Sequence, residues 1–176
     1  EDMERLASWG FNVVRLGVMW PGVEPSPGKI NATYMEEIAR LARDLAGHGV
    51  YTIADLHQDL LSRRFCGEGV PEGYLEDLLA NETSPLSQAR PFPEPVSHPL
   101  ELDADGYPDL SACLKEPNFA DFYASEQVGA LFKQLYTQGT PLNDGFLRFW
   151  EAVAGGLGAA AGGAAVARRH LRHAEG

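Results

Sequence analysis

Asp55, His57 and Asp59 occupy alternate positions at the end of an apolar run, residues 50–56. Side chains alternate along a β-strand, so this spacing puts the three polar groups on one face where a strand ends. Histidine and carboxylates are ordinary metal ligands, but the spacing matches no metallohydrolase signature, and a histidine that only stabilises the fold is the more common case. In parallel α/β proteins, ligands bind at the carboxyl ends of strands, so we expect this segment to form one edge of a binding site.

Arg15 interrupts a second apolar run, residues 11–20, whose β-branched residues are typical of a strand buried on both faces. A buried charge without a partner costs on the order of several kcal/mol, so Arg15 needs an acidic neighbour. Asp55 is the nearest candidate by strand position, and such a pair can be purely structural. Trp20 ends this run beside Pro and Gly, where it fits either the core or a platform for the apolar face of a sugar ring.

A helix between the two runs would position both strand ends. Residues 33–36 match the capping-box pattern, and apolar residues at helical spacing then predict a helix over residues 33–46. Gly47 and Gly49 follow, where a helix is expected to stop. Strand, helix and strand in this order predict one βαβ unit with a parallel pair, so the fold class is α/β.

The rest of the chain shows no further strand pattern. Residues 57–118 are rich in Pro, Gly, Ser and acidic groups, which predicts a long functional loop with a short helix near residues 74–79. Apolar and aromatic residues at helical spacing predict helices over residues 119–135 and 145–154. We expect one domain over residues 1–154 and a low-complexity, Gly/Ala-rich and basic tail over residues 155–176.

Composition argues against some classes of function. The net charge is −11, and the positive charges are scattered except near the end of the chain, so a nucleic-acid partner ranks last. No apolar stretch reaches the roughly 18 to 20 residues that a membrane span needs, so no transmembrane segment is expected. The chain opens at Glu1 inside what looks like the end of a helix, which indicates a piece of a longer product.

Two further patterns concern the cellular compartment. Asn31 and Asn81 each begin an Asn-x-Thr acceptor pattern for glycosylation, and together these patterns favour a secretory route. Cys66 and Cys113 are the only cysteines. They form either one disulfide that closes a long loop or none, and a metal site built from them is not expected.

Several spaced blocks carry a family resemblance. Residues 11–16 (FNVVRL), Trp20 with residues 23–28 (VEPSPG), residues 55–59 (DLHQD) and residues 65–71 (FCGEGVP) occur in an order that resembles glycoside hydrolase family 5. The resemblance is strongest to the endoglycoceramidase-like branch of that family. It spans residues 1–154 and is most specific over residues 11–71.

The resemblance implies a fold and an activity. The family is a (β/α)₈ barrel that hydrolyses β-glycosidic bonds with retention and without a cofactor, and the branch releases oligosaccharide from glycosphingolipids. Residues 11–20 and 50–56 would be barrel strands two and three, so the chain would form a partial barrel. Arg15, His57 and Asp59 match positions that bind or orient a carbohydrate or glycolipid substrate. From the residues themselves we also expect Trp20 to contact the sugar and Asp55 to be structural, as the partner of Arg15.

The same resemblance implies that the catalytic residues are absent. Retaining hydrolysis needs two carboxyl groups about 5 Å apart, which in this family are glutamates on strands four and seven, the first in an Asn-Glu-Pro motif. Asn81 and Glu82 lie in the long loop and are followed by Thr83, so they do not match the motif. Neither Glu24 nor Glu68 lies at a strand end where its side chain would face a partner carboxylate.

We therefore expect an inactive N-terminal part of a glycosidase whose two glutamates would lie downstream. Two alternatives remain open from the sequence. One is a non-catalytic carbohydrate-binding fragment, and the other is a metal-dependent hydrolase that uses Asp55, His57 and Asp59.

Overall fold

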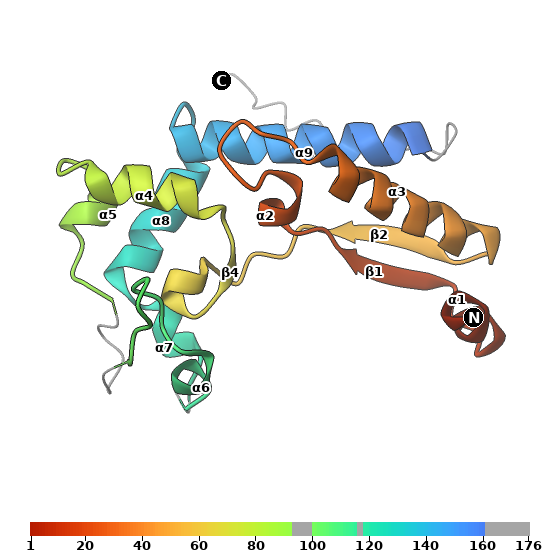
Figure 1. Ribbon diagram of the computed structural model, residues 1–176, viewed down its shortest axis with the longest axis horizontal. Coiled ribbons are helices and arrows are strands. Elements are labelled where there is room, and N and C mark those ends of the chain that lie inside the picture. The colour runs from red at the N-terminus through yellow and green to blue at the C-terminus, as the bar shows by residue number, and fades with distance from the viewer. Residues whose placement is uncertain (93–99, 116–117, 161–176) are drawn as a thin grey trace, which may run out of the picture.

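The computed structural model describes residues 1–92, 100–115 and 118–160. A two-stranded parallel sheet lies under two long helices, α3 and α9, and a lobe of shorter helices, α4 to α8, extends from one end of this unit (Figure 1). The N-terminal helix α1 (Asp2–Ser8) lies at the opposite end. The expected α/β class is therefore confirmed.

The sheet consists of β1 (Val13–Gly17) and β2 (Tyr51–Asp55), which pair in parallel with Arg15 opposite Ile53 and Gly17 opposite Asp55. Helix α3 (Ala32–Gly47) connects them, which confirms the predicted βαβ unit. Its cap differs from the prediction: the side chain of Asn31 accepts a hydrogen bond from the amide of Tyr34 at 3.1 Å. Asparagine is as good a helix cap as threonine, and the helix therefore begins earlier than residue 33.

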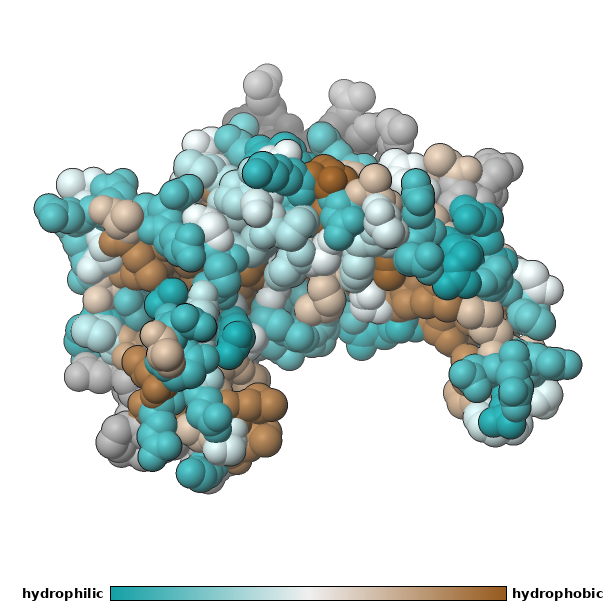
Figure 2. Space-filling model, in the orientation of Figure 1, coloured by the Kyte–Doolittle hydropathy of each residue, from teal (hydrophilic) through white to brown (hydrophobic). Residues whose placement is uncertain are grey.

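The two faces of the sheet differ in their covering. Leu16 and Ala54 point toward the helices and pack against the core. Val13, Tyr51 and Ile53 lie on the opposite face and are exposed. Figure 2 shows hydrophobic side chains at the surface over this sheet, beside α1. Two strands cannot close into a barrel, so one face of the sheet stays open.

Helix α9 (Pro141–Ala160) completes the helical layer over the sheet. It is longer at both ends than the predicted helix over residues 145–154, and it includes the first residues of the predicted tail. A Cβ atom added at Gly156 would lie 2.7 Å from the Met35 side chain, so glycine allows α9 to approach α3 closely. Residues 161–176, with the basic part of the predicted tail, lie outside the described residues.

The lobe contains the elements that sequence patterns predicted least well. Its longer helices are α4 (Glu72–Ala80) and α8 (Glu126–Tyr136), and its short ones are α5 (Pro85–Gln88), α6 (Leu110–Cys113) and α7 (Ala120–Tyr123). The single helix predicted over residues 119–135 is thus two helices, because Ser125 caps α8 through its hydroxyl. No strand was predicted after residue 56, yet β3 (Leu60–Leu61) and β4 (Glu68–Gly69) form a short parallel ladder.

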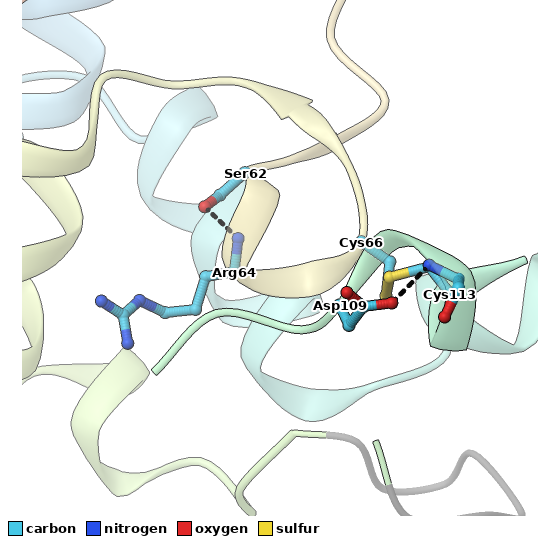
Figure 3. The surroundings of a disulfide bond; sticks show 6 residues. Ser62, Arg64, Cys66, Asp109 and Cys113 are labelled. Carbon is cyan, nitrogen blue, oxygen red and sulfur yellow. Dashed lines mark hydrogen bonds between the residues drawn. A yellow bond between two sulfur atoms is a disulfide. The ribbon is translucent and has the colours of Figure 1, made fainter. Parts of the chain in front are cut away.

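A disulfide between Cys66 and Cys113 ties this lobe together, as the first of the two alternatives predicted. Cys66 follows the 3₁₀ helix η1 (Arg63–Phe65), and Cys113 ends α6 with its amide donating to the Asp109 carbonyl at 3.1 Å (Figure 3). The bridge joins residues 47 positions apart. Among the described residues, no helix is long and apolar enough to cross a membrane.

Candidate functional site at the end of β2

The structure brings Asp55, His57 and Asp59 together at the end of β2. His57 lies between the two aspartates, with Nε2 2.9 Å from Asp59 Oδ2 and Nδ1 3.5 Å from Asp55 Oδ2. The strand itself ends at Asp55, so the alternation that suggested this grouping continues without regular strand geometry. The His57 side chain is 41% exposed and remains accessible to a ligand.

Arg15 forms the expected ion pair with Asp55, with Nη2 2.7 Å from Oδ2. The pair lies on the open face of the sheet, and the Arg15 side chain is 67% exposed rather than buried. An exposed pair of this kind contributes only about 0.2–1 kcal/mol to stability. The guanidinium therefore retains hydrogen-bond donors that point to solvent beside His57.

Tyr123 is a site residue that the sequence analysis missed. Its hydroxyl donates a hydrogen bond of 2.8 Å to Asp59 Oδ1, although the two residues are 64 positions apart. Asp59 therefore has one oxygen held by Tyr123 and the other by His57. No local pattern marks Tyr123 as a site residue, because only the folding of the lobe brings α7 to the end of β2.

These contacts set the charges of the site. The hydrogen bond that Asp59 accepts from His57 and the charge of that carboxylate raise the pKa of His57, and the charges of Asp55 and Glu68 raise it further. The Tyr123 hydrogen bond, followed by the contact with His57, lowers the pKa of Asp59. These contacts favour the protonated form of His57 and the ionised form of Asp59, so a donor and an acceptor lie side by side for a polar ligand.

The backbone that follows Asp59 is held in an unusual conformation. Leu60 and Leu61 both have positive φ angles, 53° and 62°, which cost a non-glycine residue roughly 1–2 kcal/mol each. Both side chains are fully buried, and their burial offsets this cost. A Cβ atom at Gly67 would lie 2.1 Å from the Asp59 carbonyl oxygen, so the loop can pass behind Asp59 only with glycine there.

Trp20 belongs to the core and not to the site. It is fully buried, stacks on Phe149 with ring centroids 5.6 Å apart, and donates from Nε1 to Glu24 Oε2 at 2.7 Å. No face of the indole is open to a sugar ring. The interpretation of Trp20 as a sugar platform is therefore corrected to a structural role, because α9 brings an aromatic partner onto it.

Glu24 is likewise a structural carboxylate. It is fully buried and accepts hydrogen bonds from Trp20, from the Gly28 amide and from the Tyr74 hydroxyl, the last at 2.8 Å. Burial, together with the nearby Glu24, raises the pKa of Tyr74 to about 12. Arg148 of α9 lies 3.5 Å from the same carboxylate. The group joins the loop after β1 to α4 and α9.

The metal-site interpretation finds no support in the part of the chain that the structure describes. Within it, no group of three or more His, Cys, Asp or Glu residues is arranged so that it could hold a metal ion. His57 and its two aspartates instead contact one another directly. The arrangement is suited to binding hydroxyl groups, because it alternates a cationic donor with anionic acceptors.

Comparison with known proteins gives a consistent result. Residues 1–88 match the family Cellulase (glycosyl hydrolase family 5). The chain is 37% identical over 155 residues to an endoglycoceramidase of Hydra vulgaris, and 36% identical over 156 residues to one of Cyanea nozakii. These alignments cover 88% and 89% of this chain but 28% and 29% of the relatives, so the chain spans less than a third of their length.

Solved structures show the fold. Endo-glycoceramidase II from Rhodococcus sp. superposes on this chain with a TM-score of 0.57 at 24% identity. The superposed part is 86% of this chain and 29% of the Rhodococcus chain. Cryptococcus neoformans sterylglucosidase 1 superposes with a TM-score of 0.64 at 19% identity and covers 92% of this chain and 23% of that one. The described strands and helices thus correspond to part of a (β/α)₈ barrel, as expected.

Proposed function

The chain belongs to glycosyl hydrolase family 5, and from that premise we propose that Asp55, His57 and Asp59 hold the sugar of a glycolipid substrate. The observation that carries the proposal is the position of His57 between two carboxylates while its ring stays accessible. Sugar hydroxyls both donate and accept hydrogen bonds, so neighbouring hydroxyls can bind an imidazolium and a carboxylate together.

The lipid part of the proposed substrate rests on the relatives. Two similar proteins are endoglycoceramidases, and one solved structure of endo-glycoceramidase II is a complex with ganglioside GM3. We propose a β-linked glycosphingolipid for this chain on that similarity, with the exposed Arg15 guanidinium beside Asp55 helping to orient the sugar.

We further propose that this polypeptide alone binds the substrate without cleaving it. Retaining hydrolysis requires two carboxyl groups about 5 Å apart that flank the scissile bond. Glu24 is enclosed by hydrogen-bond donors, and Glu68 lies 3.9 Å from His57 as part of the charged cluster around the imidazole. Glu82 is exposed in the turn between α4 and α5.

The test separates binding from cleavage. Saturation-transfer NMR with methyl β-lactoside measures binding, and lactosylceramide with a fluorescent acyl chain measures cleavage. His57→Ala and Asp59→Asn should each weaken binding about tenfold, because each removes one charge-assisted hydrogen bond at an exposed site. His48→Ala is the matched control, since His48 is an exposed histidine beyond α3.

Two results would refute the proposal. Unchanged lactoside binding in both His57→Ala and Asp59→Asn would show that the cluster does not hold the sugar. Release of ceramide by the wild-type chain, lost in His57→Ala, would show that the residues present are sufficient for cleavage.

A further inference from the structure

We propose that Asn81 is a site of N-linked glycosylation and that Asn31, in the second copy of the same pattern, is not. Both begin an Asn-x-Thr sequence, so the pattern alone does not distinguish them. The structure does, because it gives the two side chains different surroundings.

Asn81 lies in the turn between α4 and α5, and it is exposed together with Glu82 and Thr83. The Thr83 hydroxyl donates to Asn81 Oδ1 at 2.8 Å, and the Thr83 amide donates to the same oxygen at 3.0 Å. These bonds fix the carboxamide through its oxygen. No described residue accepts a hydrogen bond from Nδ2 of Asn81, so the nitrogen that would carry the sugar is available.

Asn31 is held differently. It is half-buried at the start of α3, where its side-chain Oδ1 accepts a hydrogen bond from the backbone amide of Tyr34. The backbone amide of Asn31 donates to the Val23 carbonyl at 2.7 Å. Thr33 lies inside the helix, and its hydroxyl makes no hydrogen bond to Asn31 among the described contacts. Oδ1 of Asn31 caps the helix, and because the residue is half-buried at the start of α3, an oligosaccharide on its Nδ2 would lie against the loop after β1.

The disulfide gives independent support for the compartment. Cys66 and Cys113 are paired, and no free cysteine remains. Structural disulfides form in oxidising compartments such as the endoplasmic reticulum, where N-linked oligosaccharides are also attached. A chain that acquires this bridge there also exposes the turn at Asn81 to the transferase.

The reaction needs a polyprenyl diphosphate that carries an oligosaccharide. Nδ2 of Asn81 forms a bond to C1 of the first sugar, while the bond between C1 and the diphosphate oxygen breaks. The lipid diphosphate leaves with the bonding electrons, and one Nδ2 proton passes to a base of the transferase. The turn lies at the outer end of the lobe, away from β1 and β2 (Figure 1). A glycan there leaves the end of β2 open.

Expression of the chain in the secretory pathway of a eukaryotic cell tests the proposal. Peptide N-glycosidase F converts a glycosylated asparagine to aspartate, so peptide mass mapping of the wild-type protein identifies each occupied position directly. We expect conversion at Asn81 and none at Asn31. Asn81→Gln and Thr83→Ala should each remove the glycan from the intact protein, whereas Asn31→Gln should leave its mass shift unchanged.

Two outcomes would overturn the inference. One is secreted wild-type protein that contains the Cys66–Cys113 bridge and has no glycan at Asn81. The other is conversion at Asn31, alone or together with Asn81, which would show that capping of α3 does not protect that residue. Because the wild-type map needs no variant to fold, loss of a variant during secretion does not affect either result.

Discussion

Removal of the bridge between Cys66 and Cys113 should lower the stability of the chain by a calculable amount. The disulfide closes a loop across 47 positions. Closing a loop of that length lowers the entropy of the unfolded chain by an amount worth about 4 kcal/mol at 25 °C. The double variant Cys66→Ser/Cys113→Ser restores that entropy and should therefore be less stable by about 4 kcal/mol. For a chain of this size, such a loss should lower Tm by on the order of 10 °C.

The backbone conformation of Cys66 predicts a second difference in stability, between two variants that both lack the bridge. Its φ angle is 63°, a left-handed conformation that glycine adopts without strain. The variant Cys66→Gly/Cys113→Ser removes the same bridge but relieves that strain. It should therefore be about 1 kcal/mol more stable than the double-serine variant.

Urea unfolding followed by far-UV circular dichroism measures all three proteins, and the measured m-values convert midpoints to free energies. A loss below about 1 kcal/mol in the double-serine variant would refute the chain-entropy argument for this loop. If the glycine variant is no more stable than the serine one, the left-handed conformation at position 66 is not costly once the bridge is absent.

Three further predictions concern the carboxylate of Asp59 and the buried carboxylate of Glu24. Asp59→Asn should lower the pKa of His57, measured by NMR titration of the imidazole, because Asp59 is the main cause of its raised value; an unchanged pKa would contradict the assigned contact. A raised histidine pKa stabilises the fold below the unfolded value of about 6.5, and this contribution is lost as pH rises through the folded value. The wild type should therefore exceed Asp59→Asn in stability by more at pH 5.5 than at pH 9. Glu24→Ala should lower the free energy of unfolding in urea by roughly 3 kcal/mol or more, since it leaves several buried donors without an acceptor. The control is Glu37→Ala, which removes an exposed partner of Arg40 and should lower it by less than about 1 kcal/mol. Equal losses in these two variants would contradict the role of Glu24.

The βαβ unit could be predicted because its signals are local. Apolar β-branched runs, a capped amphipathic helix and a glycine stop lie within residues 11–56, and each depends on near neighbours in the chain. The pairing of Arg15 with Asp55 followed from the order of the strands. The alternation of side chains along a strand predicted that Asp55, His57 and Asp59 lie together, and they do so although the strand ends at Asp55.

The remaining features depend on distant segments. Tyr123 reaches Asp59 only when the lobe has folded, and Trp20 is enclosed only when Phe149 of α9 packs on it. Helix propensity alone would end α9 near its glycines, whereas close packing of Gly156 on Met35 favours continuing the helix. The left-handed conformations of Leu60 and Leu61 have no sequence signal, because leucine rarely adopts them.

The packing of α9 on α3 has a consequence for biosynthesis. Met35 and Ile38 of α3 belong to the same core as Phe149 and Val153 of α9, yet roughly a hundred residues separate the two helices. At about 5–20 residues per second, a ribosome needs roughly 5–20 s to make the intervening chain. During that interval the apolar side of α3 has no α9 to cover it, so it is available to a chaperone that binds the nascent protein.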